Sequence, residues 1–212
     1  MKFFPNQRSV VNFIFKSVVV GISLLVLAVS VARAGWEIWA KNNNQETQAN
    51  NLIQFTAVFS DGETAPETYK LPEIGLLPDQ MFYGLKKIRD YLWLSFSKGD
   101  AKIKMALLLG DKSMAESMKM MEAGKYDKSL EAGNEAMDKL EYAGKLINKT
   151  TTTGKQTQQL HRQIFWAGYA YKEVVEKMQD AFGLDTEKFL KLVTRINEWN
   201  KEQEKERYNW DY

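Results

Sequence analysis

Residues 99–148 decide the fold, and their sequence is GDAKIKMALLLGDKSMAESMKMMEAGKYDKSLEAGNEAMDKLEYAGKLIN. Apolar residues recur at intervals of three and four over 101–123 and again over 126–148, which is the spacing of amphipathic helices. Gly124 lies between the two stretches, and glycine is the usual left-handed residue after a helix end. The sequence therefore predicts two antiparallel helices joined by a tight turn.

Glycine lies on the predicted inner face of the second helix of this pair. Gly133 and Gly144 share a stripe, at spacings of three and four, with Leu130, Met137, Leu140 and Ile147. Because glycine lets two helix backbones approach closely, this stripe predicts close antiparallel packing.

Three further helices are predicted on either side of this pair. A helix that begins near residue 79 carries Phe82, Leu85, Ile88, Leu92 and Phe96 at amphipathic spacing. Residues 156–181 and a segment that starts at Asp185 predict a fourth and a fifth helix, separated from the third by the threonines at 150–153. The predicted fold class is all-α: an antiparallel bundle of about five helices preceded by an N-terminal membrane helix or signal peptide.

The N-terminal 34 residues predict export from the cytoplasm. Residues 17–32 carry no charge, and Lys2, Arg8 and Lys16 precede them, as expected for the side of a membrane segment that stays inside. If the segment is a signal peptide, Ala32-Arg33-Ala34 is the cleavage motif and Gly35 the new N-terminus. If it is retained, 10–32 give 23 residues, enough to span a bilayer. Trp36 and Trp39 then fall at the far interface.

The sequence divides into four predicted regions: a signal peptide or anchor (1–34), an extended linker (35–78), a helical hairpin domain (79–149) and a C-terminal helical pair that packs on it (155–207). Residues 41–78 contain three of the four prolines and many amides, which is typical of a linker. Within it, Leu52 to Phe59 alternates weakly and is either a short strand or a continuation of the membrane helix.

Composition excludes several classes of chemistry. The chain has no cysteine, which excludes disulfides and thiolate ligands. His161 is the only histidine, and Gln158 stands where a di-iron Glu-x-x-His motif needs a glutamate. Beyond residue 34 there are 25 basic and 27 acidic residues, which is poor material for binding nucleic acid. We expect no catalytic, cofactor-binding or metal-binding residues.

The stretch from Leu77 to about Leu140 resembles domain of unknown function 5667, a helical domain of exported and membrane-anchored bacterial proteins. The resemblance rests on LLPDQMFYGLKKIRDYLWLSFS, then GDKSMAES, then EAGKY at the turn. The proline-led entry with an aromatic residue and a lysine is matched by Pro78, Tyr83 and Lys86. Gly84 and Ser113 depart from the pattern, where the family often has proline and arginine. The resemblance implies an extracytoplasmic helical hairpin and brings no catalytic residues.

These observations predict a membrane-tethered, extracytoplasmic interaction or structural module of the bacterial cell envelope, with no catalytic activity. Its predicted partners are the membrane, through the N-terminal helix, and an envelope protein; cleavage at Ala34-Gly35 predicts a secreted protein instead. The aromatic residues of the C-terminal tail, Tyr208, Trp210 and Tyr212, are candidate contact residues. A tail that folds back on its own bundle explains these aromatic residues equally well.

Two alternative functions stay open. A small-molecule or peptide sensor predicts an open apolar groove between the methionine-rich hairpin and the aromatic residues of 156–181; the sequence also allows these methionines to fill the core. An envelope hydrolase predicts carboxylates that converge on a cleft around His161.

Overall fold

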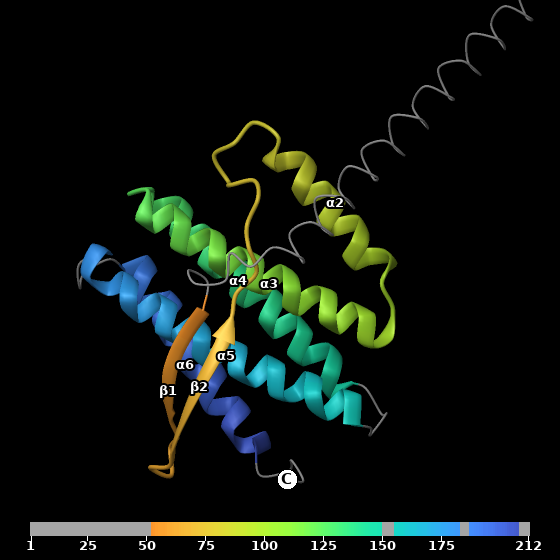
Figure 1. The fold of residues 1–212 in the computed structure, drawn as a ribbon, viewed down its shortest axis with the longest axis vertical. Helices are drawn as coiled ribbons and strands as arrows, with labels where there is room; N and C mark the ends of the chain where they lie inside the picture. Colours follow the sequence, from red (N-terminus) through yellow and green to blue (C-terminus); the bar gives the residue numbers. More distant parts are fainter. Residues whose placement is uncertain (1–51, 150–154, 183–186, 208–212) are drawn as a thin grey trace, which may run out of the picture. The chain divides into compact units, whose positions relative to one another are not determined.

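The computed structural model describes residues 52–149, 155–182 and 187–207 (Figure 1). They belong to one compact unit and form a β-hairpin and five helices. The bounds are β1 Leu52–Val58, β2 Thr64–Lys70, α2 Tyr83–Phe96, α3 Gly99–Glu122, α4 Tyr126–Asn148, α5 Lys155–Phe182 and α6 Glu187–Arg207. The predicted N-terminal membrane helix, the threonine run and the C-terminal aromatic residues lie outside the described residues.

The predicted pair of antiparallel helices is confirmed as α3 and α4. Gly124 adopts a φ of 70° after the end of α3, as the sequence predicts. The backbone N–H of Gly124 donates to the carbonyl of Met121, and that of Lys125 donates to the carbonyl of Met120, each at 2.8 Å. These two bonds form a Schellman motif, which satisfies the last carbonyls of α3 and reverses the chain in a few residues.

Small residues set the distance between α3 and α4. Ser117 donates its hydroxyl to the carbonyl of Ser129 at 2.7 Å, and Ser129 donates to the carbonyl of Ser117 at 2.8 Å. A Cβ on Gly133 would lie 3.3 Å from the Ser117 hydroxyl. The predicted role of glycine in close helix packing is therefore supported at this position.

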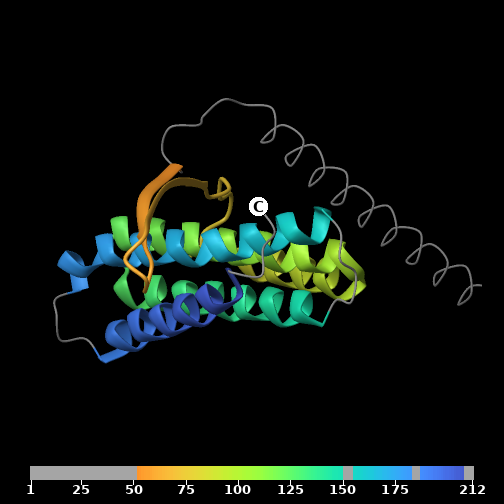
Figure 2. The same cartoon turned by 90° about the horizontal axis from the view of Figure 1, so that it is seen from below.

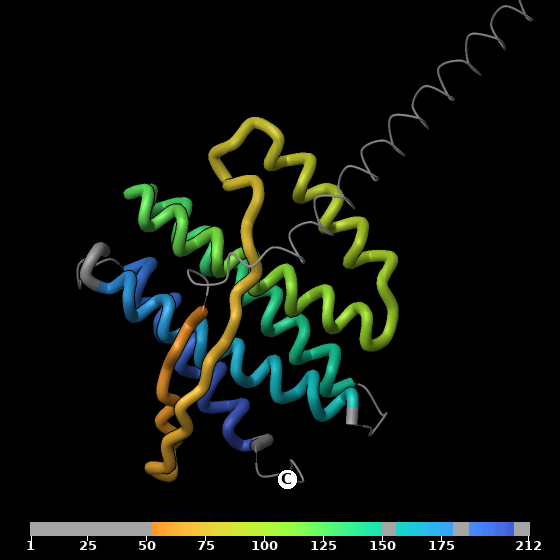
Figure 3. The backbone as a smooth tube through the Cα atoms, viewed as in Figure 1, coloured from red at the N-terminus to blue at the C-terminus, as the bar shows by residue number. Residues whose placement is uncertain are grey.

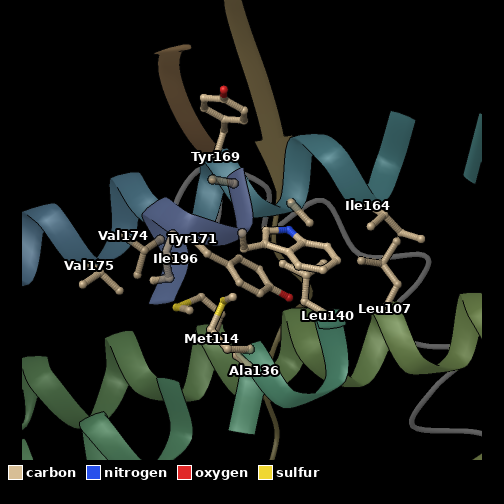
Figure 4. Packing of buried hydrophobic residues seen from close by; sticks show 14 of the residues in the cluster. Leu107, Met114, Ala136, Leu140, Ile164, Tyr169, Tyr171, Val174, Val175 and Ile196 are labelled. Atoms are coloured by element: carbon tan, nitrogen blue, oxygen red, sulfur yellow. The ribbon is translucent and has the colours of Figure 1, made fainter. Parts of the chain in front are cut away.

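The helices α5 and α6 complete the bundle, and Figure 2 shows them running alongside α3 and α4. The shared core includes Met114, Leu140, Ile164 and Ile196, which come from four different helices (Figure 4). The Trp199 ring of α6 lies over the buried Gly144 of α4 and leaves no room there for an added Cβ. The bundle therefore depends on glycine to bring α6 close.

The described residues are mostly helical and contain five helices, as predicted, but they also form a β-hairpin that the all-α prediction lacks. β1 pairs with β2 in antiparallel register, from Leu52 opposite Lys70 to Val58 opposite Thr64. Buried and exposed residues alternate along β1, so that Ile53, Phe55 and Ala57 all face the bundle. The hairpin occupies part of the segment that the sequence predicts as an extended linker, and the weak alternation of residues 52–59 is the signal of a strand.

The hairpin is held on α5 by aromatic packing. The Phe59 ring lies 6.1 Å from the Phe165 ring and 5.8 Å from the Tyr169 ring between centroids. The Phe55 ring lies 6.2 Å from the Trp166 ring. Offset and tilted ring pairs of this kind each contribute about 0.5–1.5 kcal/mol beyond the apolar area that they bury. The hairpin therefore belongs to the bundle.

The helix α2 lies at the edge of the bundle, where Figure 3 shows the chain entering it from β2 through residues 71–82. Among the described elements, α3 is the one whose backbone comes close to it. The apolar residues that recur at amphipathic spacing along this helix do not pack on the bundle. No residue of α2 is buried, and Leu85 and Phe96 are 64% and 79% exposed.

Substituting the helical glycines tests whether close approach holds α6 in place. Gly144→Ala should lower the free energy of unfolding by about 1–3 kcal/mol, because the new methyl group clashes with the Trp199 ring. The control Gly84→Ala, which has nothing within 4 Å of the added Cβ, should be neutral or stabilise by up to about 1 kcal/mol through helix propensity. Urea denaturation measures both. Equal effects of the two substitutions would contradict the packing argument.

Candidate functional site

The central helix α3 carries two buried carboxylates. Asp111 is 7% exposed and Glu116 is 1% exposed. Removing a carboxylate from water costs several kcal/mol unless hydrogen bonds or a cation replace the lost solvation. The partners of these two groups therefore determine what packs against α3.

Asp111 is bound by two tyrosines from different elements. Tyr69 of β2 donates its hydroxyl to both carboxylate oxygens at 3.0 and 3.1 Å, and Tyr171 of α5 donates at 3.0 Å. Burial raises the pKa of Asp111 to about 7, although the two hydroxyl donors act in the opposite direction. Burial, together with the charge of Asp111, raises the pKa of both tyrosines well above the usual value. This carboxyl links the hairpin, α3 and α5.

Glu116 is bound by α2. Tyr83 donates its hydroxyl to Glu116 Oε2 at 2.7 Å, and the Lys86 ammonium forms an ion pair with Oε1. Burial lowers the pKa of Lys86 to about 8 and raises the pKa of Tyr83 to about 12. A second ion pair, 2.9 Å between Lys87 Nζ and a Glu135 oxygen, connects α2 to α4. The polar side of α2 therefore faces the bundle.

A charged cavity of about 220 Å³ lies at this junction of α2, α3 and α4. Its lining includes Lys86, Lys112, Asp90 and Glu116. Burial lowers the pKa of Lys112. Because the lining contains both acids and bases, the cavity has no concentrated charge of one sign.

The opposite side of α2 is an apolar surface, which we call the outer stripe. Its side chains share one face of the helix and the turn before it, and each is more than two-fifths exposed: Met81, Phe82, Leu85, Ile88, Leu92 and Phe96. A typical soluble surface has scattered apolar residues, whereas a contiguous row along one helix indicates an interaction site. The outer stripe is the candidate functional site of the described chain.

His161 does not lie near the buried carboxylates. It is half-exposed near the start of α5, and Tyr171, which contacts Asp111, is ten residues further along the same helix. Ten helical residues span about 15 Å. Within the described ranges, no group of three or more His, Cys, Asp or Glu side chains is placed to hold a metal ion. The structure therefore places neither Asp111 nor Glu116 beside His161.

The groove that the sensor hypothesis predicts is filled. Met114, Met120 and Met137 are completely buried, and so is Tyr171 of α5. Figure 4 shows Met114 and Tyr171 within the packed core. These side chains are core residues, as the other interpretation of the methionine cluster expects.

Sequence reasoning missed both carboxylates, although one of them had a signal. Asp111 lies at helical spacing from Leu107 and Met114, so it falls on the stripe predicted to be buried. An acidic residue on such a stripe needs a partner, and that partner is supplied by residues 42 and 60 positions away. The periodicity of a single helix does not predict contacts between residues so far apart in the sequence.

The described chain is a mostly helical bundle faced by a small antiparallel hairpin. Residues 75–164 match the family model Domain of unknown function (DUF5667), which confirms the resemblance seen in the sequence. The match covers α2, α3, α4 and the first part of α5, and therefore includes the outer stripe and both buried carboxylates. No curated protein and no solved structure matches the chain.

The raised pKa of Asp111 predicts a pH dependence of stability. Between about pH 4 and pH 7 the folded protein holds a proton that the unfolded chain releases near 3.8, so the free energy of unfolding falls as pH rises. The slope from this group is at most about 1.4 kcal/mol per pH unit. Asp111→Asn should remove that part of the slope in urea denaturation across this range.

The matched control is Asp127→Asn, since the side chain of Asp127 is 85% exposed on α4. This variant should keep the slope of the unsubstituted protein. If Asp111→Asn also keeps this slope, the carboxyl of Asp111 is not protonated in the folded protein near neutral pH, and the raised pKa of Asp111 is wrong.

Proposed function

We propose that this protein is a membrane-tethered, extracytoplasmic helical module of the bacterial cell envelope that acts by contact and without catalysis. The observation that carries the proposal is the outer stripe, a row of exposed apolar side chains on α2. The uncharged N-terminal residues 17–32, with basic residues before them, supply the proposed tether. The outer stripe is the proposed contact surface.

The polar groups of the described bundle support a binding role. The buried carboxylates of Asp111 and Glu116 are both engaged in holding other elements on α3. A general acid or base needs access to a substrate, whereas these side chains are only 7% and 1% exposed. Their arrangement is that of structural links.

None of the described helices is long and apolar enough to cross a membrane. The proposed tether is the N-terminal segment, which lies outside the described residues. The 19 residues 33–51 that follow it can reach at most about 65 Å when fully extended. A retained anchor consequently keeps the bundle close to the bilayer.

Fractionation with intact-mass measurement tests the tether. The full-length protein with a C-terminal tag, expressed in its native cells, should remain in the membrane pellet after high-salt and alkaline washes. Its mass should include residues 1–34, and external protease should degrade the bundle in cells with a permeabilised outer layer. A soluble product that starts at Gly35 would contradict the tethered module and indicate a secreted protein.

Proximity labelling from the same tag tests the contact role. A reproducible set of envelope proteins should be enriched over an unrelated single-span protein that carries the same labelling enzyme on the same side of the membrane. A labelling profile identical to that of this control would contradict an envelope-protein partner.

A further inference from the structure

The polar face of α2 points toward the bundle and its apolar face points away from it, which is the opposite of a core helix. Its inner side presents Tyr83 and Lys86 to the buried Glu116, and its partly buried Leu94 touches the core. Its outer side carries the outer stripe, in which Ile88 is 58% exposed near the middle. Rotating α2 to bury the stripe would leave Glu116 without its lysine, so the ion pair holds the apolar face outward.

We infer that the outer stripe of α2 lies in the headgroup region of the lipid bilayer to which the chain is tethered. The inference rests on the tethering proposed above and adds the identity of the surface that α2 contacts. An amphipathic helix that lies in the membrane plane buries its apolar face about 5–10 Å into the boundary between headgroups and acyl chains. The outer stripe has the residue types and continuity for this contact.

The side chains beside the outer stripe suit a membrane interface. Residues 81–98 contain four basic residues and one acidic residue. Two of the basic residues, Lys86 and Lys87, form ion pairs on the inner side of α2 and are not available to lipid. The other two are Arg89, whose side chain is 42% exposed and pairs with Asp90, and Lys98, which is exposed. Such cations are attracted to anionic headgroups, each by about 1 kcal/mol when close to the surface.

Aromatic residues with polar atoms flank the same surface. Tyr91 and Trp93 are exposed, and Arg89 lies over the Trp93 ring with its guanidinium carbon 5.2 Å from the ring centroid. Tyrosine and tryptophan are enriched at the level of the headgroups, because an apolar ring and a polar atom find suitable surroundings there. These residues extend the proposed contact beyond the aliphatic side chains.

The proposed anchor favours lipid over a second protein as the occupant of the stripe. A helix that lies in the membrane plane needs only a shallow contact with the interface. A weak lipid contact suffices here, because a membrane anchor holds the bundle at an effective concentration on the order of millimolar.

Site-directed spin labelling of the full chain tests the inference. The chain has no cysteine, so Ile88→Cys introduces a single attachment point for a nitroxide. The control is Leu190→Cys, at an apolar residue of α6 that is 48% exposed and lies outside the outer stripe. Each labelled protein is reconstituted into vesicles of phosphatidylethanolamine and phosphatidylglycerol. Power saturation then measures collisions with oxygen, which partitions into lipid, and with a nickel chelate, which stays in water.

The ratio of oxygen to nickel accessibility should be several-fold higher for the label at residue 88 than for the label at residue 190. A low ratio at residue 88, equal to that of the control, would show that the stripe faces water and overturn the inference. Protection from both reagents would also overturn it, and would indicate a protein contact such as a second copy. If Ile88→Cys unfolds the protein, Leu85→Cys on the same stripe replaces it.

Flotation of the same vesicles separates this inference from the proposed function. If the protein fails to float with the vesicles, tethering by residues 17–32 is wrong. If it floats while the label at residue 88 remains accessible to the nickel chelate, tethering stands and the lipid contact of α2 is wrong.

Discussion

The close packing of α3 on α4 is the contact on which the rest of the structure depends. It requires the Schellman turn at Gly124 and the reciprocal hydrogen bonds between Ser117 and Ser129. It also requires small residues on α4, where Leu192 and Trp199 of α6 pack on Gly133 and Gly144. Larger side chains at either glycine would separate the helices that enclose the core, because protein interiors have few voids to absorb them.

This packing places Asp111 and Glu116 of α3 in the interior. The elements that supply their hydrogen-bond and ion-pair partners are thereby held on α3. Asp111 needs donors and finds them on β2 and α5, while Glu116 needs a cation and finds Lys86 of α2. An unpartnered buried carboxylate is far less stable than a partnered one, so the hairpin and α2 are held by electrostatics as well as by apolar contact. For α2 the consequence is functional, since satisfying Glu116 turns the apolar side of the helix outward.

Local periodicity predicted the helices well and the hairpin poorly. The helix predicted at 126–148 has those bounds in the structure, because a repeat over more than twenty residues with glycine at its boundary is a strong local signal. The strand β2, TAPETYK, has no regular apolar alternation and contains Pro66. The hairpin that it forms with β1 packs on α5 through Phe55 and Phe59, whose ring partners are more than one hundred residues away. The absence of thiolate chemistry and the single histidine were evident from composition, whereas the partners of Asp111 were not.

The sequence by itself determined where the helices run, where α3 turns into α4, and which side chains of α2 form an apolar face. Only the tertiary structure decided where that face points. Helical periodicity defines two faces, but it does not say which face meets the bundle, because that choice depends on the neighbouring surface. Here the neighbouring surface contains Glu116, a carboxylate buried between helices. Its need for Lys86 and Tyr83 outweighs the gain from burying Leu85 and Ile88, and it leaves those residues exposed.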